Sequence, residues 1–213
     1  MTFCQVNNVA ATYITQVALT WPHAPDFIPV AKHVLLDILL QHCSQLQDLD
    51  IEVRPGDLDF LSTFFTAKWP RLTRFTISTY ALRVYMPQAV DDGLCLLFSQ
   101  FIKNHPNLER LFVTCPDLIS PQHTNFGQLS KLRGLGIPSC SNPGLLFDPT
   151  VPDNLECLVF RLDSSTLSLF SSLSYLHTVM MEISYSNDPY STLENLPVTI
   201  RHLSLKLLWH PEV

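Results

Sequence analysis

Residues 104–113, NHPNLERLFV, decide the fold of this chain. They combine the end of a helix, a Pro-Asn turn and a short strand, in which Leu108, Leu111 and Val113 follow the pattern apolar-x-x-apolar-x-apolar. The last two residues lie two apart, so in a strand they point to the same face, and the first enters the core from the turn. One such unit cannot bury its own apolar side, which predicts neighbouring units of the same kind.

The same pattern recurs along the chain. The later matches begin at positions 108, 132, 155, 176 and 200, which are 21 to 24 residues apart and fall within the roughly 20–29 residues of a leucine-rich repeat. Stacked units of this kind bury a continuous core and pair their strands into a parallel sheet. The eight matches are Ile14/Val17/Leu19, Leu46/Leu49/Ile51, Leu72/Phe75/Ile77, Leu108/Leu111/Val113, Leu132/Leu135/Ile137, Leu155/Leu158/Phe160, Leu176/Val179/Met181 and Ile200/Leu203/Leu205.

The segments between the matches fit the other half of each unit. Residues 30–43 carry a helical stripe made of Val34, Leu35, Ile38 and Leu39. Helices are likewise predicted for residues 58–69 and 91–105, a shorter helix for 165–176, irregular structure for the Pro-rich stretch 142–154, and about one turn for 191–196.

The fold class predicted from these patterns is α/β. Residues 1–213 form a single leucine-rich-repeat solenoid, with the parallel sheet on its concave side and helices and irregular turns on its convex side. An ordinary α/β domain with parallel strands is the alternative, but it does not explain the recurring turns. The strands are predicted near residues 14–19, 46–51, 72–77, 108–113, 132–137, 155–160, 176–181 and 200–205.

The composition narrows the class of protein. The 213 residues carry 13 Lys and Arg against 19 Asp and Glu, a net charge of −6, which argues against nucleic acid as a partner. The longest apolar run, residues 34–40, is far too short to span a membrane. The six Cys form no CxxC motif, no Asn-x-Ser/Thr site occurs and no signal peptide is evident, so we expect reduced thiols in the cytoplasm or nucleus.

The outward-facing positions of the strands form the candidate binding surface. An acidic strand carrying Asp48 and Asp50 is predicted beside Arg74, close enough for Asp48 and Arg74 to pair. An apolar group lies farther along, around two glycines, and Arg and aromatic residues are typical of protein interfaces. The alternative is a solvated sheet face with salt bridges worth about 0–1 kcal/mol each. The predicted partner-binding residues are Asp48, Asp50, Glu52, Arg74, Arg110, Phe112, Val159, Arg161 and Met180.

Chemistry-bearing motifs are missing from the sequence. No HxxxH, HExxH or GxSxG occurs, and the GxG at residues 134–136 lacks the third glycine and following helix of a phosphate-binding loop. His42 and His105 precede turns into strands, which favours a structural role, and Cys43 is expected to be a small buried apolar residue. We therefore expect no enzyme activity, no metal and no cofactor.

The blocks HCSQLQDLDI (42–51), WPRLTRFTI (69–77) and HPNLERLFV (105–113) resemble the repeats of fungal F-box proteins with ribonuclease-inhibitor-like leucine-rich repeats. In that family the repeat domain binds a substrate, while a separate F-box docks on an adaptor of a cullin ubiquitin ligase. The leading LP-x-E-[IL] motif of an F-box does not occur here. Most positions at which the repeat consensus has Asn or Cys also hold other residues, and only Cys140 conforms.

The resemblance implies a protein-binding module, the substrate-recognition part of an F-box-type ubiquitin-ligase receptor. Its partner would be a protein on the concave face, and a cullin-ligase adaptor would be reached through a module missing from this sequence. The alternative is a non-catalytic scaffold or inhibitor that acts without the ubiquitin system. Solenoids need polar caps, and residues 1–14 and 205–213 offer little capping, so we expect exposed apolar edges and self-association.

Overall fold

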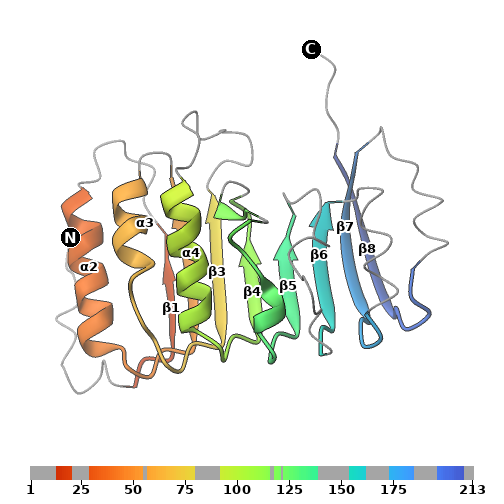
Figure 1. The fold of residues 1–213 in the computed structure, drawn as a ribbon, viewed down its shortest axis with the longest axis horizontal. Coiled ribbons are helices and arrows are strands. Elements are labelled where there is room, and N and C mark those ends of the chain that lie inside the picture. The colour runs from red at the N-terminus through yellow and green to blue at the C-terminus, as the bar shows by residue number, and fades with distance from the viewer. Residues whose placement is uncertain are drawn as a thin grey trace, which may run out of the picture.

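The protein, seen in a computed structural model, is built around one sheet whose strands lie side by side in chain order (Figure 1). Helices α2, α3 and α4 lie in front of its N-terminal part in that view. The residues that the structure describes are 13–20, 29–54, 57–79, 92–115, 118–120, 122–138, 154–161, 173–184 and 196–208.

All eight strands of the sheet run parallel, and each pairs with its neighbours in the chain. Connections between parallel neighbours are right-handed, so a sheet built in chain order keeps all its crossovers on one face. The α/β class and the single parallel sheet are confirmed. The strands are β1 (Gln16–Leu19), β2 (Asp48–Val53), β3 (Arg74–Thr79), β4 (Arg110–Val113), β5 (Gly134–Ile137), β6 (Cys157–Arg161), β7 (Thr178–Ser184) and β8 (His202–Leu208).

A tight turn precedes the strands and explains why they begin two residues after the repeat pattern does. The Leu108 N–H donates to the His105 carbonyl at 3.1 Å, and Leu72 donates to Trp69 at 3.0 Å in the same way. In these units the first apolar residue of the pattern therefore closes a turn and enters the core from it, as the sequence predicts. The same four-residue turn leads into Leu46, Leu132, Leu176 and Ile200.

The described helices are α2 (Pro29–His42), α3 (Leu58–Phe64), α4 (Asp92–Asn104) and the short 3₁₀ helix η2 (Phe126–Gln128). The predicted apolar stripe of α2 is partly wrong, because Val34 is exposed and the buried face runs through Lys32, Leu36 and Leu39.

The second predicted helix is shorter than expected: α3 ends at Phe64, whereas the pattern predicts a helix to residue 69. The residue before a proline avoids helical geometry, and Trp69 and Pro70 are required for the turn into β3. The elements predicted for residues 142–154, 165–176 and 191–196 lie almost wholly outside the described residues; residues 173–175 form a coil and a turn.

The core between the helices and β3 is aromatic. Phe101 of α4 lies at its centre, with its ring centroid 4.9 Å from that of Phe75, 4.2 Å from His105 and 5.7 Å from Phe64. Trp69 packs at the edge of this group and is almost completely buried. The core continues through the buried leucines of the later strands as one cluster.

The last repeat departs from prediction. Leu203 and Leu205 of β8 follow the pattern of core residues, but they are 41% and 45% exposed. The corresponding residues of β7, Val179 and Met181, are 0% exposed. The pattern is the same in both strands, but among the described residues β8 has a strand neighbour on one side only, whereas β7 has one on each side.

Among the described residues, four cysteines are free thiols: Cys43, Cys95, Cys115 and Cys157. Cys43 is fully buried beside the turn into β2, as predicted. In the same described ranges, no helix is long and apolar enough to cross a membrane.

Lys32 and Asp57 form an ion pair beneath the helices, with only 7% and 11% of their side chains exposed. Asp57 also accepts a hydrogen bond from the Arg54 N–H at 2.9 Å, so the pair ties α2 to the segment that leads from β2 into α3. A buried charge is tolerated only when it is paired and hydrogen-bonded, so each partner depends on the other.

We expect Asp57→Ala to lower the free energy of unfolding by about 3–5 kcal/mol, because it removes the carboxylate that pairs with the buried Lys32 ammonium and accepts from the Arg54 N–H. Urea unfolding followed by circular dichroism measures this. Arg133→Met, which breaks an exposed ion pair with Glu156, is the matched control and should cost no more than about 1 kcal/mol. Equal losses for the two variants would contradict the prediction.

His105 is buried in the aromatic core and joins two elements. Its Nδ1 lies 2.7 Å from the Phe101 carbonyl, to which it donates, and its Nε2 accepts from the Trp69 N–H at 3.0 Å. The ring is neutral in this arrangement. Burial lowers the pKa of His105 below its ordinary value, with the nearby Lys68 acting in the same direction and the hydrogen bond to Phe101 opposing it.

Because the pKa of His105 is lowered in the folded state, the folded protein becomes less stable as the pH decreases. The unfolded chain takes up the proton at about pH 6.5 and the folded protein does not, so the contribution of His105 is complete above that value and is lost progressively below it. We expect urea unfolding to show a loss of stability from about pH 7.5 to 5.5 that is smaller in His105→Gln. An unchanged difference between the two pH values in the variant would contradict this role.

Candidate functional site

The face of the sheet opposite the helices, called here the open face, is formed by every second residue of each strand. Its first row contains Gln16, Asp48, Arg74, Arg110, Gly134, Cys157, Thr178 and His202, which are aligned by the strand register. Its second row contains Ala18, Asp50, Thr76, Phe112, Gly136, Val159, Met180 and Ser204. Glu52 and Ser78 begin a third row, which includes Arg161, Glu182 and Lys206 farther along the sheet.

The structure places all nine predicted binding residues on the strands that form this face. Asp48, Arg74 and Arg110 are direct neighbours in the first row. The register also brings Phe112, Val159 and Met180 into one stretch of the second row, with Gly136 between the first two. Glu52 and Arg161 lie on β2 and β6, so they are not brought together, and the Arg161 side chain lies outside the described part.

The β2 side of the open face is acidic. Arg74 Nη1 lies 3.4 Å from Asp48 Oδ2, which confirms the expected pairing, and both groups are partly exposed. Partial burial raises the pKa of Asp50, and the neighbouring charges of Asp48 and Glu52 raise it further. The largest cause of the raised pKa is the partial burial of the Asp50 carboxyl, and its two acidic neighbours add a smaller repulsion. A positively charged group from a partner would relieve this repulsion.

The middle of the open face is apolar and closely packed. A Cβ atom built on Gly136 would lie 1.9 Å from Phe112 Cδ2, so the Phe112 ring lies directly on the backbone of β5. The aliphatic part of Arg110 lies beside Gly134, where an added Cβ would make only an ordinary contact at 3.4 Å. Gly136 therefore makes room for the Phe112 ring, and Met180 is exposed two strands beyond Gly136.

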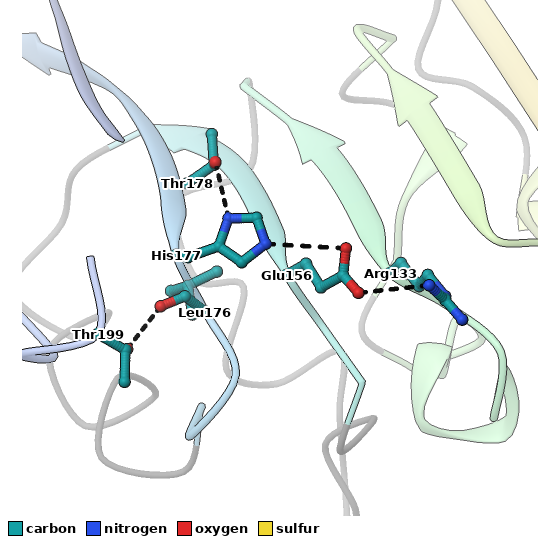
Figure 2. A network of polar contacts seen from close by, with 6 residues as sticks. All are labelled: Arg133, Glu156, Leu176, His177, Thr178 and Thr199. Carbon is teal, nitrogen blue, oxygen red and sulfur yellow. Dashed lines mark hydrogen bonds and ion pairs between the residues drawn. The ribbon is translucent and has the colours of Figure 1, made fainter. Parts of the chain in front are cut away.

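A charged row along the turns was not singled out from the sequence. Each of its residues immediately precedes a strand, and in the C-terminal half the row contains both acidic and basic side chains: Glu109, Arg133, Glu156, His177 and Arg201. Figure 2 shows its centre, where Glu156 lies 3.5 Å from Arg133 and 3.8 Å from His177. The sequence contained this signal, because these residues all occupy the first variable position of the repeat, directly after its first apolar residue.

The same close-up shows how the row connects to its surroundings. His177 Nδ1 lies 3.1 Å from Thr178 Oγ1, and the Thr199 hydroxyl donates to the Leu176 carbonyl at 2.6 Å (Figure 2). Polar side chains also link neighbouring turns: Asn107 donates to the Pro70 carbonyl at 3.3 Å, and Asn154 to the Ser130 carbonyl at 3.2 Å. These contacts hold the turns in line beside the open face.

Within the described ranges, no three His, Cys, Asp or Glu side chains are grouped so that they could hold a metal ion. Cys157 lies half-buried in the first row, where burial raises its pKa despite the opposing effect of Arg110. Its thiol is therefore protonated at neutral pH and is a poor nucleophile.

No protein-family model matches the chain, and no curated protein matches it significantly.

We expect Gly136→Ala to force the Phe112 ring away from the sheet, because the added methyl group and the ring would occupy the same space. The loss in unfolding free energy should be about 1 kcal/mol or more. In a double-mutant cycle with Phe112→Ala, the two effects should be non-additive by at least about 0.5 kcal/mol, since the second variant removes the clash. Additive losses would show that the ring does not lie on Gly136.

Proposed function

We propose that this chain is a protein-binding module, a leucine-rich-repeat solenoid whose open face is the concave side and receives one partner. The observation that carries the proposal is the pairing of two unlike surfaces on that face, an acidic strand and an apolar group. Support for the solenoid comes from the eight parallel strands in chain order, each of which begins two residues after the start of a repeated pattern.

The partner that fits this face has a defined chemistry. A Lys or Arg side chain would meet Asp50 and Glu52 on β2, and an apolar side chain would meet Phe112, Val159 and Met180 on β4, β6 and β7. Neighbouring strands are about 4.8 Å apart, so the basic and apolar groups of the partner would be separated by roughly 10–24 Å. Arg74 and Arg110 lie between the two surfaces and offer donors to carbonyl or carboxylate groups of the partner.

The resemblance to F-box-associated repeats gives this binding a specific role. In that role the chain is the substrate-recognition part of a ubiquitin-ligase receptor, and the protein on its open face is the substrate. The role rests on the resemblance of three short blocks, whereas the binding itself rests on the composition of the face.

Affinity purification of the tagged chain from its own cells, with partners identified by mass spectrometry, tests the proposal. We expect wild-type protein to recover a specific set of partners that Asp50→Lys and Met180→Asp both lose. Asp50→Lys puts a positive charge on the acidic strand, and Met180→Asp puts a negative charge in the apolar group. Single substitutions at the centre of an interface typically cost 2 kcal/mol or more, about thirtyfold in affinity.

Lys103→Glu is the matched control, because it changes a charge of similar exposure on α4, away from the open face. It should recover the same partners as wild type. Loss of partners in Lys103→Glu but not in Asp50→Lys would place the binding surface on the helices and overturn the proposal. Recovery of a cullin and its adaptor would support the ligase role, and recovery of other proteins alone would favour a scaffold or inhibitor.

A further inference from the structure

The exposed edge of the sheet at β8 is a second surface, distinct from the open face. Leu203 and Leu205 are 41% and 45% exposed, although they occupy the positions that are buried in the preceding strands. Among the described residues, β8 has a strand neighbour on one side only. The β8 strand has seven residues, as does β7, and both strands are longer than β1 to β6.

The main chain of β8 presents unpaired groups at this edge. The His202 N–H donates to the His177 carbonyl at 3.0 Å, so residue 202 faces β7. Main-chain groups alternate in direction along a parallel strand, so those of 204, 206 and 208 face β7 as well, and those of 203, 205 and 207 face away. A row of this kind is a template for another strand.

We propose that β8 pairs with β8 of a second copy of the chain in the antiparallel direction. The two copies are related by a two-fold axis that is perpendicular to the sheet and passes midway between their Leu205 residues. This axis keeps the apolar faces of both copies on the same side, so Leu203 and Leu205 of the two chains form one continuous strip. A two-fold axis along the strands would turn the leucines of the copies to opposite sides. A two-fold contact also closes on itself and does not extend into a filament.

The charges of β8 select this register. With Leu205 opposite Leu205, residue 203 faces 207 and Lys206 faces Ser204, and all seven residues of the strand are paired. A shift by two residues in one direction would place Lys206 opposite Lys206 of the partner, and like charges directly opposite are destabilising. A shift by two residues in the other direction would leave two residues of each strand unpaired. Lys206 keeps its ion pair with Glu182 of its own chain, at 2.7 Å.

The first test is light scattering of the full chain over a range of concentrations. One strand pair buries less than the about 1,200 Å² of a stable interface, so we expect dissociation on the order of 10 µM. Leu205→Pro removes an N–H that faces the free edge and leaves the hydrogen bonds to β7 intact, so it should shift the dimer to monomer by at least tenfold in dissociation constant. Val198→Ser, which removes a fully exposed apolar residue outside β8, should dimerise like wild type.

The second test fixes the register and does not depend on Leu205→Pro folding. Ser204 and Lys206 of opposite chains would form a non-hydrogen-bonded pair, with Cα atoms about 4.5 Å apart, which a disulfide can bridge. Chains carrying Ser204→Cys and Lys206→Cys should therefore cross-link under mild oxidation when mixed. Each variant alone, and wild type with its own cysteines, should remain at background.

A wild-type chain that stays monomeric to about 100 µM would overturn the proposal, given the affinity expected for a strand pair. So would a dimer that gives no cross-link in the mixture, or a chain that forms filaments. Since the partner-recovery experiment reads the open face, its result is distinguishable from the result at this edge.

Discussion

A single repeated main-chain connection sets up this structure. At each step along the sheet, the carbonyl of the residue before a strand accepts two N–H groups from the next unit; the Thr73 carbonyl, for example, accepts from Glu109 at 2.7 Å and from Arg110 at 3.0 Å. The same double acceptance links Thr15 to the unit of β2 and His177 to the unit of β8. It fixes the register at the start of each strand, so that side chains of different repeats fall into straight rows.

Because the rows are straight, one face of the sheet forms the core and the other face forms the open surface. The described helices lie on one side of the sheet (Figure 1), and there the aromatic residues of α3, α4 and β3 pack into a dense core. The open face contributes less to stability, because exposed ion pairs such as that of Asp48 and Arg74 are worth little. Its composition is therefore free to serve recognition, and the unlike acidic and apolar surfaces are consistent with that use.

The open face and the β8 edge would act together in a dimer. The proposed axis is perpendicular to the sheet, so both copies would present their open faces on the same side. A partner with two binding segments, or a partner that is itself a dimer, would then engage both faces with a higher effective concentration for the second contact. The apolar residues Leu203 and Leu205 would be buried by the same arrangement, which removes an edge prone to aggregation.

The sequence by itself determined the parallel sheet, the position of its strands and the rows of its open face, because residues two apart in a strand share a face whatever surrounds them. It also determined the pairing of Asp48 with Arg74, since one pattern repeated in each unit implies one register. Only the tertiary structure decided what each side chain contacts: that Phe112 lies on Gly136, that Lys32 is buried against Asp57, and that α2 turns Leu36 inward and Val34 outward. Burial depends on the neighbours that a residue acquires on folding, and for that reason Leu203 and Val179 share one pattern while only the second is buried.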